Sequence, residues 1–153
     1  MSMRKKSLHQ GFSLIEVLIF ITILSLIFIA AAAVGTVSIR NSQNSANKLV
    51  ATHYAEEAIE WLRSQKNADW VIFTEYGNPP PKIYCFYTEP ISTWPLTTGN
   101  CTNDQVIDSL FRREVTVAYD IVLEMVNIDV NVMWSEGGNN YSVPISTVFT
   151  SLE

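Results

Sequence analysis

The feature that most constrains this chain is a run of 23 residues near its N-terminus, from Phe12 to Val34. The run is apolar apart from a few small hydroxyl residues and one charged residue, Glu16. As a helix it would span about 34 Å, which is enough to cross the hydrocarbon core of a bilayer. The apolar stretch of a cleaved signal peptide is shorter, roughly 7–15 residues. We therefore interpret the run as a retained membrane anchor.

The charges around this run predict its orientation. Three basic residues, Arg4, Lys5 and Lys6, precede it, and no lysine or arginine lies within it. Because basic residues stay on the cytoplasmic side of a span, we expect the N-terminus in the cytoplasm and the C-terminal domain outside. Beyond this leader the chain has seven Lys and Arg against fifteen Asp and Glu. Such an acidic domain would repel phosphate, which argues against a nucleic-acid partner.

Glu16 requires a partner, because a carboxylate at mid-bilayer costs about 2.5–3.5 kcal/mol on insertion scales and less near an interface. Phe12 lies four residues upstream, on the same helical face. Its nitrogen is an uncharged amide while Gly11 is joined to it. Cleavage of the Gly11–Phe12 bond would create a cation there, on the same chain or on a neighbouring one. A single cut would therefore explain the leader, the glycine and the glutamate together.

These residues carry a family resemblance. Lys5-Lys6 followed by Gly11-Phe12-Ser13-Leu14-Ile15-Glu16-Val17-Leu18 resembles the type III signal sequence of type IV pilins and of the pseudopilins of type II secretion. The resemblance implies that a prepilin peptidase cuts after Gly11 and methylates the new amine of Phe12. It also implies that Glu16 pairs with the N-terminal amine of an adjacent subunit. The expected partners are thus the peptidase, other pilin or pseudopilin subunits, the inner-membrane assembly platform and, before assembly, the lipid bilayer.

One departure from the family concerns the middle of this segment. Many pilins carry a proline there, whereas this chain has none between Phe12 and Asn78. Gly35 is the only intrinsic weak point, because glycine costs about 1 kcal/mol relative to alanine in a helix.

The apolar helix is expected to continue beyond the membrane. Residues 41–66 contain neither proline nor glycine, and their apolar residues recur at three- and four-residue spacing. This stripe consists of Ala46, Leu49, Val50, Tyr54, Ala58, Trp61 and Leu62. We therefore predict one helix from about residue 12 to about residue 66. The alternative is a separate amphipathic helix that follows a hinge at 35–40.

The C-terminal third predicts an antiparallel sheet. Apolar residues alternate within 112–124, at Val115, Val117 and Tyr119, and also over 127–134 and 141–149, while a shorter run at 83–87 also fits a strand. Gly137-Gly138 supplies the positive φ angles that a tight hairpin needs. Pro144 cannot donate to a ladder, so the last strand is expected at the edge or bulged. A sheet with one apolar face needs cover, and the helical stripe is available. The fold class is therefore α+β: a long N-terminal helix packed on a small antiparallel sheet.

Residues 67–111 show no sustained periodicity and contain Cys85 and Cys101. If this region is exported, a disulfide is expected, which would stabilise the fold by about 3 kcal/mol in the chain-entropy model. The alternative is two unrelated buried thiols. Residues 70–94 also hold seven aromatic residues, which are either core or an exposed surface for another pilin, DNA or a cell surface; burial is favoured. They are Trp70, Phe73, Tyr76, Tyr84, Phe86, Tyr87 and Trp94.

Neither a nucleophile–base pair nor a metal set is present at recognisable spacing, so we expect no enzyme, no cofactor and no metal site. His53, Glu56-Glu57, Asp104 and Asp108 are interpreted as ordinary surface residues.

The resemblance implies a filament subunit with a leader at 1–11, a transmembrane or filament-core helix at 12–37, an amphipathic half at 38–66 and a head at 67–153. The hairpin around Gly137 is most similar to minor pilins of the pilus-modification type and to pseudopilins of the I type. The alternatives are a type II secretion pseudopilin and a membrane-anchored binding module. The expected location is the bacterial inner membrane and then the filament.

Overall fold

A computed structural model describes residues 13–151. The basic residues Arg4, Lys5 and Lys6 and the predicted cleavage site Gly11–Phe12 lie outside the described residues. The chain divides into two compact units, Met1–Asn44 and Ser45–Glu153.

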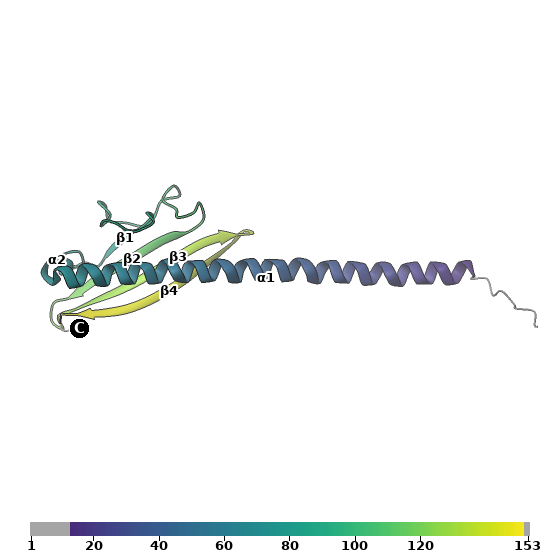
Figure 1. The fold of residues 1–153 in the computed structure, drawn as a ribbon, viewed down its shortest axis with the longest axis horizontal. Helices are drawn as coiled ribbons and strands as arrows, with labels where there is room; N and C mark the ends of the chain where they lie inside the picture. The colour runs from purple at the N-terminus through teal and green to yellow at the C-terminus, as the bar shows by residue number, and fades with distance from the viewer. Residues whose placement is uncertain (1–12, 152–153) are drawn as a thin grey trace, which may run out of the picture. The chain divides into compact units, whose positions relative to one another are not determined.

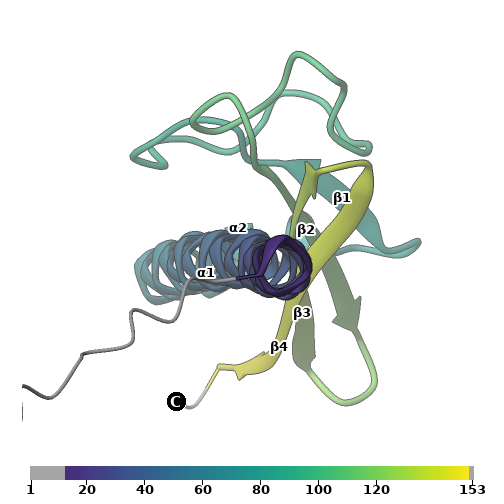
Figure 2. The ribbon, with the colours of Figure 1, turned by 90° about the vertical axis from the view of Figure 1, so that its right-hand side faces the viewer.

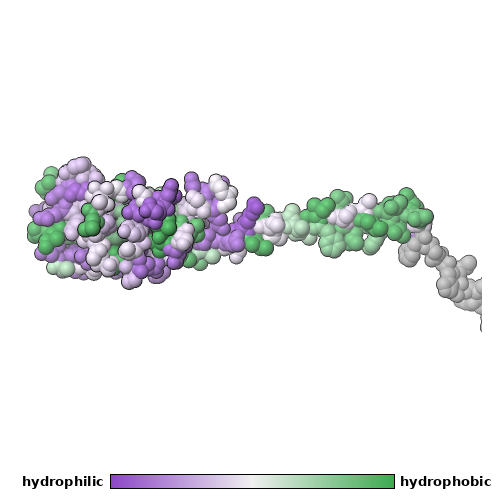
Figure 3. Space-filling model, turned by 90° about the horizontal axis from the view of Figure 1, so that it is seen from above, coloured by the Kyte–Doolittle hydropathy of each residue, from purple (hydrophilic) through white to green (hydrophobic). Residues whose placement is uncertain are grey.

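The first helix, α1, runs from Leu14 to Ala68 without interruption (Figure 1). Gly35 lies inside it and does not break it, so the prediction of one helix is confirmed and the hinge at 35–40 is not observed. The reason is local, because no proline removes a backbone donor anywhere along the helix. In the part of α1 that belongs to the first unit, the side chains are apolar and exposed over several turns, as the green band in Figure 3 shows.

The second unit contains a four-stranded antiparallel sheet in the order β1-β2-β3-β4. Its strands are β1 (Lys82–Cys85), β2 (Arg112–Asp120), β3 (Met125–Glu136) and β4 (Asn139–Thr150). The predicted meander is therefore confirmed. Gly137 and Gly138, with φ of 58° and 82°, form the hairpin between β3 and β4. Pro144 lies on β4, which is an edge strand, as its missing donor requires.

Within the second unit, the C-terminal part of α1 covers one face of this sheet (Figure 2). The buried face of the sheet is an alternating set of valines, isoleucine and tryptophan, because successive strand residues point to opposite faces. It includes Val115, Val117, Val126, Ile128, Val130, Val132 and Trp134. The opposite face carries polar residues such as Thr116, Asn127 and Asp129.

The predicted stripe on α1 is partly wrong. Leu49 is 74% exposed, and Ala46 and Val50 are also on the solvent side. Tyr54, Ala58 and Leu62 of the predicted stripe are buried against the sheet, and Ala51, Ala55 and Ile59 complete the packing face. Alanines are suited to this contact because a small side chain lets the helix backbone approach the sheet, and the prediction fails only in the upstream part of the stripe, at Ala46, Leu49 and Val50.

A short helix, α2 (Trp70–Glu75), follows α1 and was not predicted. Its start is set by Asp69, whose side chain accepts a hydrogen bond from the Ile72 amide at 3.0 Å. Gly77 follows it, and the Gly77 carbonyl accepts a hydrogen bond from the Tyr119 amide at 2.8 Å. A Cβ at Gly77 would lie 2.9 Å from the Tyr119 nitrogen, so this close approach requires glycine.

Candidate functional site

Glu16 lies in the first turn of α1 with its side chain exposed. The N-terminal end of a helix favours a negative charge, because the first backbone N–H groups have no partner within the helix. The next basic residue along α1 is Arg40, about 36 Å away at the standard helical rise. Within the described part of α1, therefore, no cation lies close enough in sequence to neutralise this carboxylate.

The first half of α1 is long and apolar enough to cross a membrane, and it is the one such helix among residues 13–151. Three of its hydroxyl side chains are bonded within the helix and do not weaken this property. Thr22, Ser25 and Thr36 donate to the carbonyls of Ile19, Thr22 and Ala33 at 2.8, 2.9 and 2.8 Å. Each hydroxyl proton is therefore satisfied inside the helix, which lowers its cost in lipid.

The predicted cleavage after Gly11, the methylation of Phe12 and the pairing of Glu16 stay predictions.

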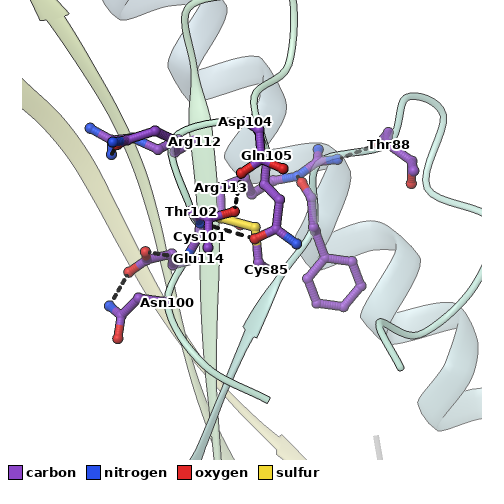
Figure 4. Close-up of a disulfide and its surroundings, with 12 residues drawn as sticks. Cys85, Thr88, Asn100, Cys101, Thr102, Asp104, Gln105, Arg112, Arg113 and Glu114 are labelled. Atoms are coloured by element: carbon purple, nitrogen blue, oxygen red, sulfur yellow. Dashed lines mark hydrogen bonds between the residues drawn. A yellow bond between two sulfur atoms is a disulfide. The ribbon is translucent and has the colours of Figure 1, made fainter. Parts of the chain in front are cut away.

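In the second unit, Cys85 at the end of β1 forms a disulfide with Cys101, as predicted (Figure 4). The loop that it closes is also fastened to β2 by Glu114. The Glu114 carboxylate accepts a hydrogen bond from the Cys101 amide and another from the Asn100 side chain, both at 2.8 Å. Cys85 is the register partner of Glu114, so the covalent and the polar link act at one position of the sheet.

Arg113 is the main residue that the sequence analysis missed. It is fully buried, and its guanidinium donates to the carbonyls of Phe86, Thr88 and Tyr54 at 3.1, 2.9 and 2.9 Å. It also forms an ion pair with Glu57 at 2.6 Å. Glu57 was interpreted as a surface residue, and that interpretation is wrong. The available signal was the alternation in β2, because Arg113 lies two residues before Val115 and therefore on the apolar face.

Tyr54 and Asp108 form a second polar contact at the edge of the core. The Tyr54 hydroxyl donates to the Asp108 carboxylate at 2.5 Å, so Asp108 is exposed as expected but has a partner that the sequence did not identify. Burial, the hydrogen bond to Asp108 and the negative charge of Glu89 together raise the pKa of Tyr54. Asp104, which was interpreted in the same way, accepts a hydrogen bond from Thr102 that lowers its pKa.

The aromatic residues of 70–94 are mostly core, as the favoured alternative predicted. Trp94 lies at their centre and stacks on Tyr76 with 3.8 Å between ring centroids. It also meets Trp61, Tyr84 and Phe86 at 5.3–5.8 Å in edge-on or tilted geometry. Tyr87 is the exception, since it is half exposed. His53 is exposed, and within residues 13–151 no three metal-ligating side chains lie together.

Comparison with known proteins adds information about the N-terminal segment. Residues 6–32 match the family model described as the prokaryotic N-terminal methylation motif. This match supports a type IV pilin-like or pseudopilin-like subunit, and the prepilin-type signal implies processing by a prepilin peptidase and assembly with other pilins. No curated protein and no solved structure matches the chain.

Proposed function

We propose that this chain is a structural subunit of a type IV pilus-type filament. The observation that carries the proposal is the N-terminal methylation motif at residues 6–32, whose glutamate, Glu16, opens an unbroken apolar helix. Together with the motif, a helix of this length suggests membrane anchoring followed by assembly into a filament.

In this proposal, a prepilin peptidase removes residues 1–11 and methylates the amine of Phe12. The subunit waits in the inner membrane, with its N-terminus in the cytoplasm and its head outside, and then moves into the filament through the assembly platform. The charged amine of Phe12 and the carboxylate of Glu16 then pair between adjacent subunits. Both charges lie among apolar helices, where effective dielectric is low and an opposite charge within reach is worth more than in water.

Within this class we propose a minor subunit that initiates, caps or modifies assembly. The supporting features are the small four-stranded sheet, the disulfide-tied loop and the hairpin that leads into a C-terminal edge strand. The second candidate in the same class is a minor pseudopilin of a type II secretion system. The N-terminal motif is common to both, so it favours neither.

The pairing of Glu16 can be tested by filament incorporation in the cells that produce the protein. We expect Glu16→Leu to reduce the amount of this subunit in the sheared filament fraction by tenfold or more, which corresponds to about 1.4 kcal/mol. Thr22→Val is the matched control, because it also replaces a polar group on the apolar helix and should leave incorporation unchanged. Incorporation of Glu16→Leu at the normal level would contradict the proposed pairing. Deleting the pilus platform or the secretion platform in turn would show which system takes up the subunit.

A further inference from the structure

The turn between β2 and β3 has an unusual composition. It consists of Ile121, Val122 and Leu123 between Asp120 and Glu124, and the three apolar side chains are 62%, 90% and 60% exposed. Turns between strands are normally built from Gly, Pro, Asn, Asp and Ser, because these residues satisfy the turn backbone and tolerate water. Three exposed aliphatic residues at a turn therefore have no explanation in the folding of the head itself. We call Ile121–Leu123 the apolar turn.

The apolar turn is held in a defined conformation. The Asp120 side chain accepts hydrogen bonds from the amides of Val122 and Leu123, at 2.9 and 3.0 Å. Glu124 adopts a left-handed conformation with φ of 52°, which returns the chain into β3. The nine residues of β2 and the twelve of β3 fix both ends of the turn in the sheet. The apolar side chains are thus presented to solvent by a rigid support, which reduces the ordering cost of binding.

The surroundings of the apolar turn are acidic. Asp120 and Glu124 flank it directly. At the same end of the head lies α2, which meets β2 where Trp70 packs edge-on against Tyr119, with 6.5 Å between ring centroids (Figure 1). This segment adds two further carboxylates, Asp69 and Glu75, and exposes two more apolar side chains, Val71 and Ile72. Neither 69–77 nor 119–125 contains a lysine or an arginine, although the nearby Lys82 side chain donates a hydrogen bond to the Glu75 carbonyl at 3.0 Å.

We propose that the apolar turn is a docking site for a different protein, which presents an apolar groove bordered by lysine or arginine. Charge complementarity selects this partner, because an apolar centre with a charged rim of one sign fits a rim of the opposite sign. A symmetric contact between two copies would set acidic rims against each other. Two of the chain's few basic residues, Arg63 and Arg113, are already paired with Glu60 and Glu57. An anionic lipid surface would be repelled in the same way.

The test places a photo-crosslinking amino acid at position 122 of the full-length protein in the cells that produce it. Position 142 is the control, because Ser142 is exposed on β4 and lies on the polar face of the sheet. We expect a crosslink from position 122, and none from position 142, to one other protein. Mass spectrometry should place the linked peptide in an apolar segment flanked by basic residues.

A charge variant then tests the acidic rim. Asp120→Asn with Glu124→Gln removes both charges, and an asparagine oxygen can still accept the two amide hydrogen bonds of the turn. We expect this double variant to lower the crosslink yield severalfold, and charge reversal of the partner's basic residues to lower it similarly. Formation of the Cys85–Cys101 disulfide in the variant would show that the head still folds. Adducts only to copies of this chain or to lipid, no adduct at position 122, or a yield insensitive to the rim charges would each overturn the proposal.

Discussion

At the scale of single residues, Arg113 is the clearest determinant of how the head is held together. Its guanidinium has no contact with solvent and uses four acceptors, which come from α1 and from the chain just after β1. Replacing a buried arginine of this kind is costly, because the groups that accept its hydrogen bonds lose their donor inside the protein. Arg113 therefore links the helix, the sheet and the loop through hydrogen bonds.

We predict that Arg113→Met destabilises the head by about 3–5 kcal/mol, since the buried carbonyls of Phe86 and Tyr54 and the partly buried Glu57 all lose the guanidinium as a donor. Arg113→Lys should also be destabilising, because an ammonium group cannot reach the same set of acceptors in a fork. Urea unfolding of the oxidised head within the full-length protein in detergent measures the effect. Arg112→Met is the neighbouring control and should change the free energy of unfolding by less than about 1 kcal/mol. Equal effects at both positions would contradict this account of Arg113.

Tyr54 predicts a dependence of stability on alkaline pH. An unfolded phenol ionises near pH 10, whereas the raised pKa of Tyr54 keeps its proton in the folded head. Above about pH 10 the folded state therefore binds more protons than the unfolded state, and stability falls as the pH rises further. We expect Tyr54→Phe to make this fall shallower between about pH 9 and 11. It should also lower stability at neutral pH by about 1.5–3 kcal/mol, through loss of the hydrogen bond to Asp108.

The control for this prediction is Tyr87→Phe, which removes a phenol from a half-exposed position. The free energy of unfolding, measured in urea at each pH, compares the two variants with the unmodified protein. The same alkaline slope in the Tyr54→Phe variant as in the unmodified protein would show that Tyr54 is not responsible.

At the scale of elements, the loop between β1 and β2 depends on its disulfide. Removing the Cys85–Cys101 link should cost about 3 kcal/mol in the chain-entropy model for a loop of this length. We predict that Cys85→Ala with Cys101→Ala lowers the urea midpoint accordingly but preserves the sheet, because Glu114 still holds Asn100 and the Cys101 amide position. Amide hydrogen exchange should then rise in 86–106 before it rises in β3. Uniformly faster exchange across the sheet would contradict this localisation.

Several elements could be predicted from the sequence because their signals are local. The long helix follows from an apolar run without proline, the hairpin from Gly137-Gly138, and the edge position of β4 from Pro144. The packing face of α1 was predicted only in part: Tyr54, Ala58 and Leu62 are buried as expected, whereas Ala51 and Ala55 were missed and Leu49 faces solvent. The burial of Arg113 was also missed, because it depends on contacts that are distant in the sequence. A charge is expected outside, and the acceptors that allow its burial come from segments up to 59 residues away in the chain.

At the scale of the whole molecule, the two units require different surroundings. The first half of α1 carries exposed apolar side chains over most of its length, whereas the head has its own buried core. The first unit therefore needs lipid or neighbouring helices, while the head needs only its own contacts and its disulfide. Glu16 belongs to the first unit and has no basic residue near it in the described sequence of α1, so the account depends on a charge created at Phe12.

The most direct test of this central claim is the N-terminal sequence and intact mass of the protein isolated from the membranes of the cells that produce it. We predict a chain that starts at N-methylated Phe12 and has a mass that includes the oxidised Cys85–Cys101 pair. That result would supply the cation that Glu16 requires. A chain that still starts at Met1, in cells shown to contain an active prepilin peptidase, would contradict the account.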